Sequence, residues 1–218
     1  MRRVVVLRPE PGASATLKRA HDLGLEAVAL PLFELRAIPW RMPQPTEYDA
    51  LLLTSANAVR SAGNQLAACR SLPVHAVGQA TADAVLRGGL TVASVGRGGV
   101  DDLLSSLPTG LRLLHLCGQE RQTPGAPKQR ITAVPVYTAE PLARSDLQAL
   151  KGAVVMVHSP RAGDRLAQLL SSRGTTAIAG ISSAAADACG SGWQKVSVAD
   201  RPHDVALLSL AARMCQES

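Results

Sequence analysis

Short apolar runs alternate along the chain with segments in which apolar residues recur every three or four positions. The first run, Arg3–Leu7, is followed by a helical pattern near Ser14–Leu23, which Gly24 closes, and then by the run Glu26–Leu30. Further predicted strands are Ala50–Leu53, Val74–Val77, Thr91–Val95, Arg112–Leu116, Ile131–Tyr137, Ala153–Val157, Thr176–Ala179 and Lys195–Val198. Apolar strands separated by amphipathic helices are typical of parallel sheets covered by helices. The pattern therefore predicts an α/β fold.

Three consecutive strand–helix units recur later in the chain in the same order. The matching segments are Leu51–Ala58 with Val155–Ala162, Val77–Ala84 with Ala179–Ala186, and Asp101–Ser105 with Asp204–Leu208. Their offsets are 104, 102 and 103 residues. A register that holds across three units favours an internal duplication over a chance match of common β/α patterns. The chain is therefore expected to form two similar lobes.

The duplication predicts two Rossmann-like or flavodoxin-like lobes, each with a parallel sheet. The second copy ends after its third helix, so the spare strand–helix–strand piece Arg3–Leu30 is expected to join its sheet. We expect one discontinuous lobe of residues 1–36 and 139–218 and one inserted lobe of residues 40–136. The Pro-punctuated segments Pro31–Pro45 and Ala133–Pro141 fit a two-stranded connector between the lobes.

The charge balance favours an anionic partner. Lys and Arg total 23 against 17 Asp and Glu, a formal net charge of +6. One Phe, two Tyr and two Trp are too few for a stacking platform, which argues against nucleic acid. No apolar stretch is long enough for a membrane span or a signal peptide, and the four cysteines lack disulfide spacing. We expect a cytoplasmic monomer that binds a small polyanion, without nucleic acid or membrane.

Polar residues that directly follow the predicted strands are the candidate binding residues, because ligands of doubly wound sheets lie beyond the carboxyl ends of the strands. Several begin helices, where unpaired N–H groups and the helix dipole favour carboxylate or phosphate. Their hydroxyls also suit helix capping, a role compatible with binding. The candidates are Arg8, Thr54, Ser55, Gly78, Gln79, Thr81, Gly118, Ser159, Gly180, Ser182 and Ser183. We expect facing loop tips of the two lobes to form a cleft for a polyanionic small molecule.

Other chemistry has little support in the sequence. The five histidines do not combine with cysteines or acids at metal-binding spacing, and no Gly-x-Ser-x-Gly elbow is present, so neither a metal nor a covalent nucleophile is expected. Tyr137 lies near the end of the run Val134–Thr138, at the point where the second connector leaves one lobe. It is either a core tyrosine with a satisfied hydroxyl or a proton-donating phenol.

Five segments, in this order and spacing, resemble the uroporphyrinogen-III synthase family. They are Leu53–Val59, Ala76–Ala82, Val134–Thr138, the turn at Ser159 and Pro160, and the turn Gly180–Ala184. The likeness covers nearly the whole chain. It implies two α/β lobes on a two-stranded connector, and a lyase reaction that needs no cofactor. In this reaction the linear tetrapyrrole hydroxymethylbilane closes to uroporphyrinogen III, with loss of water and inversion of the last pyrrole ring.

The resemblance also implies roles for individual residues. Tyr137 matches the family's tyrosine and is the candidate catalytic residue, which would protonate or hydrogen-bond the leaving hydroxyl. The four residues that match positions near the substrate are Thr81, Ser159, Ser182 and Ser183. The chain departs from the family pattern at His158 and after Arg112–Leu116, where a helix is shortened or missing within residues 117–130. The competing hypothesis is a non-enzymatic two-lobed binding or regulatory module for a small polyanion.

Overall fold

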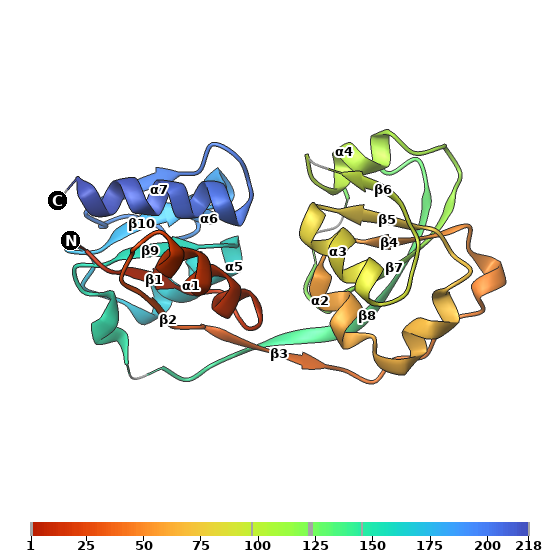
Figure 1. Cartoon of the computed structure of the whole chain (residues 1–218), viewed down its shortest axis with the longest axis horizontal. Helices are drawn as coiled ribbons and strands as arrows, with labels where there is room; N and C mark the ends of the chain where they lie inside the picture. The colour runs from red at the N-terminus through yellow and green to blue at the C-terminus, as the bar shows by residue number, and fades with distance from the viewer. Residues whose placement is uncertain (1, 97, 122–123, 145, 218) are drawn as a thin grey trace. The chain divides into compact units, whose positions relative to one another are not determined.

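The computed structural model describes residues 2–96, 98–121, 124–144 and 146–217. The chain divides into two units, the first formed by Met1–Glu34 with Glu140–Ser218 and the second by Leu35–Ala139 (Figure 1). Each unit is a β-sheet of mainly parallel strands that is covered by helices, so the predicted α/β fold is confirmed. Among the described residues, no helix combines the length and apolar character that a membrane span requires.

The sheet of the first unit has the strand order β11-β10-β9-β1-β2, and its neighbouring strands are parallel. Its strands are β1 (Val4–Val6), β2 (Ala27–Ala29), β9 (Val154–Val157), β10 (Ala177–Gly180) and β11 (Lys195–Val198). Its helices are α1 (Gly12–Asp22), η3 (Leu147–Leu150), α5 (Pro160–Leu169), α6 (Ser183–Asp187) and α7 (Asp204–Gln216). The piece β1-α1-β2 thus lies in the same sheet as the C-terminal strands.

The core of the first unit has two faces because strand side chains alternate. Val4, Val6 and Met156 pack with residues of α1 and α7 in one hydrophobic cluster. The two helices lie on the same face of the sheet (Figure 1). Val5 and Val155 are equally buried and, by the alternation, point to the other face. Burial on both faces explains why these strands are continuous apolar runs.

The sheet of the second unit has the order β3-β8-β7-β4-β5-β6, and its strands from β8 to β6 are parallel to their neighbours. Its strands are β3 (Phe33–Ala37), β4 (Ala50–Leu53), β5 (Val74–Val77), β6 (Val92–Gly96), β7 (Arg112–Gly118) and β8 (Arg130–Pro141). Its helices are η1 (Pro45–Glu47), α2 (Ala56–Ser61), η2 (Gly63–Cys69), α3 (Gln79–Arg87) and α4 (Val100–Ser105). The order β6-β5-β4-β7-β8 repeats the order β11-β10-β9-β1-β2.

Apolar residues also cover both faces of the second sheet. Leu51, Leu53 and Leu114 pack with α2, η2 and α3 in one cluster, which we call the α3-side cluster. Leu52 and Leu113, at alternate positions, pack with α4 in a second cluster, which we call the α4-side cluster. Between Gly118 and Arg130 the described residues form neither helix nor strand, so no helix there corresponds to α1 of the first unit.

Two chain segments pass from one unit to the other. β3 occupies only part of the predicted connector Pro31–Pro45, and the residues after Ala37 are irregular until η1. β8 is longer than the predicted strand Ile131–Tyr137 and continues to Pro141. The Ile38 N–H donates to the Val136 carbonyl at 3.1 Å, which joins the two segments beyond the end of β3.

Candidate active site

Hydroxyl and amide groups gather at the carboxyl ends of β9 and β10 in the first unit. The Ser159 Oγ accepts a hydrogen bond from the Ala162 N–H at 3.2 Å and caps α5. The Ser182 Oγ accepts from the Ala185 N–H at 3.3 Å and caps α6. Ser183 is the first residue of α6, and its hydroxyl makes no hydrogen bond to another described residue. Ser159 and Ser182 therefore have a structural role, whereas the Ser183 hydroxyl remains available to a ligand.

Gly180, the last residue of β10, has a packing role. A Cβ at this position would lie 2.8 Å from the Ala186 Cβ, closer than side chains pack. The glycine therefore lets α6 approach the end of β10.

Arg8 follows β1 and forms an ion pair with Asp204, the first residue of α7, with 3.2 Å between Nη1 and Oδ1. The Asp204 carboxylate also accepts hydrogen bonds from Thr16 at 2.7 Å, from Arg19 at 2.8 and 3.1 Å, and from the His158 Nε2 at 2.8 Å. We call these five residues the Asp204 cluster. The guanidinium of Arg8, a predicted substrate ligand, is thus already engaged within the unit.

Burial and charge set the protonation states in the Asp204 cluster. Burial raises the pKa of Asp204, but the bonds from His158 and Thr16 and the charge of Arg8 outweigh it and hold the pKa well below its usual range. Burial lowers the pKa of His158, and its bond to Asp204 offsets this only in part. Asp204 is therefore ionised and His158 neutral at neutral pH, so His158 donates through Nε2 to the carboxylate. From the sequence, His158 was identified only as a departure from the family pattern, and nothing indicated that Asp204 is its hydrogen-bond partner.

The second unit has its own polar set around the carboxyl end of β4, to which His115 contributes from within β7. The Thr54 Oγ1 lies 3.1 Å from the Nε2 of His115, and the Ser55 Oγ caps α2 by accepting from the Asn57 N–H at 3.1 Å. His115 is only 2% exposed, and burial together with the charge of Arg121 lowers its pKa to about 4. A neutral imidazole is therefore the hydrogen-bond partner of Thr54. Nothing in the sequence pattern indicated this partner.

The turn after β5 leads into α3. Gly78 is the N-cap of α3 with a φ of 80°, a conformation that favours glycine. The Gln79 Nε2 donates to the Asp83 Oδ1 at 2.8 Å on the exposed face of the helix. Thr81 is 5% exposed, so most of its surface is already covered by the unit. Of these three candidates, Gln79 is the most accessible to a ligand.

Tyr137 and Gly118 lie against each other on adjacent strands. Tyr137 is half-buried and packs against the α3-side cluster. A Cβ added at Gly118 would lie 2.9 Å from the Tyr137 Cζ, so the phenol ring rests on the glycine. The Tyr137 hydroxyl makes no hydrogen bond to another described residue. Within the described part of the chain, the phenol thus differs from a core tyrosine whose hydroxyl is satisfied internally.

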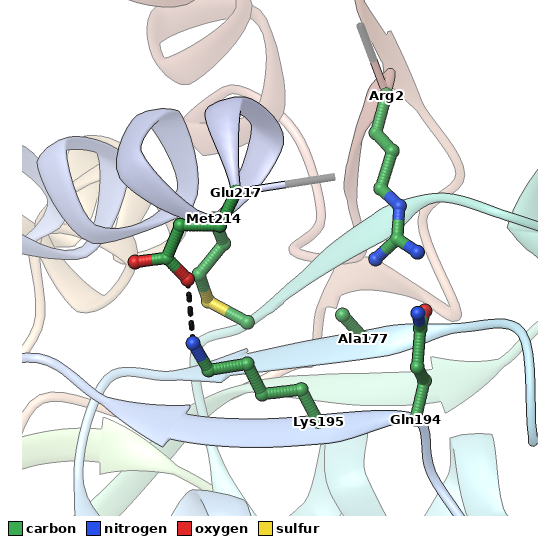
Figure 2. Close-up of a pocket in the computed structure, with 6 residues that line it drawn as sticks. All are labelled: Arg2, Ala177, Gln194, Lys195, Met214 and Glu217. Carbon is green, nitrogen blue, oxygen red and sulfur yellow. Dashed lines mark hydrogen bonds and ion pairs between the residues drawn. The ribbon is translucent and has the colours of Figure 1, made fainter.

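A pocket of about 180 Å³ lies at the amino ends of β10 and β11, which is the edge opposite to the candidate residues. Figure 2 shows the residues that line it. Its lining residues are Arg2, Ala177, Gln194, Lys195, Met214 and Glu217. An ion pair of 2.5 Å joins the Lys195 Nζ to Glu217 and lowers the pKa of this carboxyl. The pocket is separate from the predicted site. No cluster of three or more potential metal ligands occurs among the described residues, and the four cysteines are buried and form no disulfide.

These features define a class of α/β proteins with two units, each with hydroxyl and amide groups at the carboxyl edge of a mainly parallel sheet. A family model, uroporphyrinogen-III synthase HemD, matches residues 14–209. The chain therefore belongs to the uroporphyrinogen-III synthase family, as its sequence segments predicted. It is an enzyme of tetrapyrrole biosynthesis, a lyase that acts on a tetrapyrrole substrate, and the non-enzymatic alternative is not favoured.

Two solved structures show the same fold. Uroporphyrinogen-III synthetase from Helicobacter pylori has a TM-score of 0.66 and 19% identity, with 98% of this chain and 100% of that chain covered. A mutant uroporphyrinogen III synthase from the extremely thermophilic bacterium Thermus thermophilus has a TM-score of 0.58 and 18% identity, with 100% of both chains covered. A search of curated proteins found no match.

Proposed function

We propose that this enzyme controls the closure of hydroxymethylbilane mainly by holding one folded conformer of the linear tetrapyrrole. Departure of the terminal hydroxyl as water leaves an electrophilic azafulvene. The substituted carbon of the last ring attacks it to form a spiro intermediate, which reopens and recloses with that ring inverted. Free closure gives the unflipped type I isomer, so positioning and the exclusion of water decide the product. No cofactor is required for these steps.

The observation that carries this proposal is the collection of hydroxyl and N–H groups at the carboxyl edge of each sheet. Every ring of the substrate carries acetate and propionate carboxylates, and helix N-termini with adjacent hydroxyls suit such anions. The N-termini of α5 and α3 are therefore proposed as carboxylate sites, together with the Ser183 hydroxyl at the start of α6 and the side-chain amide of Gln79, the first residue of α3. The net charge of +6 would favour the encounter with a polyanion.

Tyr137 is the proposed catalytic residue. Its hydroxyl has no partner among the described residues, so it is free to donate a hydrogen bond or a proton to the leaving hydroxyl of the substrate. No other strong acid or base is required, because the leaving group departs as water from an activated pyrrole.

Incubation with hydroxymethylbilane, followed by oxidation and chromatographic separation of the isomers, tests the proposed function. We expect uroporphyrinogen III in excess over the type I isomer, because the enzyme directs closure through the inverted ring. Heat-denatured protein is the matched control and should give type I alone. Type I alone from the native protein would contradict the proposal and support a polyanion-binding module.

Ser183→Ala should raise KM for hydroxymethylbilane about fivefold, which corresponds to the loss of roughly 1 kcal/mol from one hydrogen bond. The thermal midpoint should stay unchanged, because this hydroxyl makes no hydrogen bond within the described protein and the cap of α6 is Ser182. Steady-state kinetics and thermal unfolding together measure both quantities. Ser172→Ala, at an exposed position, is the control. An unchanged KM for Ser183→Ala would remove this residue from the binding site.

We also propose that the protein acts as a cytoplasmic monomer without nucleic acid. Four cysteines that form no disulfide suit a reducing compartment, and the five aromatic residues are too few for base stacking. Sedimentation of the purified protein would measure its oligomeric state.

A further inference from the structure

A register shift between β7 and β8 directs the side chain of Tyr137. Cys117 pairs with Pro135, but the next residue of β7, Gly118, pairs with Tyr137. Val136 is therefore an extra residue in β8, which is the arrangement of a β-bulge. Pro135, which has no N–H to donate, stands directly before this extra residue.

The extra residue changes the face of the sheet on which Tyr137 lies. Side chains alternate along a strand, so Ile131 and Tyr137, six residues apart, would share a face in a regular strand. Ile131 packs against the α4-side cluster. Val134, Val136 and Tyr137 all pack against the α3-side cluster instead. The bulge thus places two successive residues, Val136 and Tyr137, on one face.

Backbone hydrogen bonds hold the bulge from both sides. The Gln119 N–H donates to the Tyr137 carbonyl at 2.8 Å, and the Ile38 N–H donates to the Val136 carbonyl at 3.1 Å. The bulge is therefore anchored on one side to the residue that follows β7 and on the other side to the segment after β3. The two hydrogen bonds thus fix the backbone position from which the Tyr137 side chain extends.

Gly118 provides the space for the ring. A Cβ there would lie 2.9 Å from the Tyr137 Cζ, 3.1 Å from Cε2 and 3.1 Å from Oη. Gly118 does not have a positive φ, so its backbone conformation does not itself require glycine. Glycine is therefore required at this position because the methyl group of an alanine would meet the phenol ring.

We propose that Gly118 and the bulge at Val136 are positioning elements for Tyr137, which place its hydroxyl at the carboxyl edge of the second sheet. Gly118 thus acts through Tyr137 rather than as a substrate ligand. This inference rests on the proposed function of Tyr137, because a misplaced phenol affects turnover only if the phenol takes part in the reaction.

A double-mutant cycle tests this inference. Gly118→Ala should lower kcat for uroporphyrinogen III about tenfold, because a small misplacement of a reacting group is costly. In the Tyr137→Phe background, whose hydroxyl is already absent, Gly118→Ala should change kcat less than twofold. Gly125→Ala is the matched control, since an added Cβ there meets no atom within 4 Å and the position lacks a positive φ. Equal losses from Gly118→Ala in both backgrounds would overturn the inference while leaving the function of Tyr137 intact.

Thermal unfolding provides a readout that does not depend on activity. Gly118→Ala should lower the thermal midpoint in the wild-type background but not in the Tyr137→Ala background, in which the ring is absent. This rescue also applies if Gly118→Ala alone does not fold. A similar loss in both backgrounds would mean that the added methyl group clashes elsewhere, and would overturn the inference. If Tyr137→Phe has full activity, the proposed catalytic role of Tyr137 is wrong. The thermal rescue in the Tyr137→Ala background would then show only that Gly118 contacts the ring, and not that this contact serves catalysis.

Discussion

Asp204→Ala should lower the free energy of unfolding of the first unit by about 3 kcal/mol, because it leaves a buried polar network without its central acceptor. The carboxylate is 13% exposed and accepts hydrogen bonds from Arg8, Thr16, Arg19 and His158. These donors come from the end of β1, from α1 and from the end of β9, so the loss loosens the contacts that α7 makes with all three. Denaturant unfolding measures the change.

Tryptophan fluorescence isolates the first unit in this experiment. The two tryptophans lie one in each unit, so a Trp40→Phe background leaves Trp193 as the reporter of the first unit. Glu217→Ala is the control near the end of the same helix, because its ion pair with Lys195 is exposed and contributes little. A loss for Asp204→Ala no larger than that for Glu217→Ala would contradict the structural role of the Asp204 cluster.

The lowered pKa of Asp204 predicts that the stability of the first unit depends on pH. The pKa of Asp204 is held below its unfolded value, so its stabilising contribution is present above the unfolded pKa of about 4 and is lost as the pH falls below it. The difference in unfolding free energy between the wild type and Asp204→Asn should therefore shrink between about pH 5 and pH 2. A difference that stays constant over this range would mean that the charge of Asp204 does not contribute.

Tyr137→Phe should lower kcat for uroporphyrinogen III by roughly ten- to a hundredfold without abolishing it. The substitution removes only the hydroxyl that would assist the departing water, whereas conformational control of the substrate remains. KM should change little, because phenylalanine keeps the ring against Gly118 and the α3-side cluster. Isomer-resolved initial rates give the comparison, with spontaneous type I formation subtracted.

Tyr48→Phe is the matched control for Tyr137→Phe. Tyr48 is the other tyrosine of the sequence and also packs partly buried against the α3-side cluster. It precedes β4, whereas Tyr137 lies within β8 beside Gly118, the last residue of β7. Its rate should equal that of the wild type. Equal rates for wild type and Tyr137→Phe would show that the Tyr137 hydroxyl takes no part in the chemistry. Catalysis would then rest on the positioning of the substrate alone.

The sequence by itself determined the fold class and the family of this protein. Strands such as Leu51–Leu53 and Val154–Val157 can be recognised in the sequence because a strand buried on both faces requires apolar residues at every position. The internal repeat could be recognised because the two copies preserve this pattern at a nearly constant offset in residue number. Polar residues after these strands were found by one rule, that parallel strands end at a common edge, and their roles in binding remain predictions.

The tertiary structure alone decided which of those polar residues already have partners. Arg8 and Asp204 are 196 residues apart in the chain, and no local pattern records a contact at that distance. The direction of Tyr137 likewise depends on one extra residue in the pairing of β8 with β7, which a strand pattern read in isolation does not reveal. Local periodicity reports whether a residue is covered, whereas the identity of its neighbour arises only when separate strands come together.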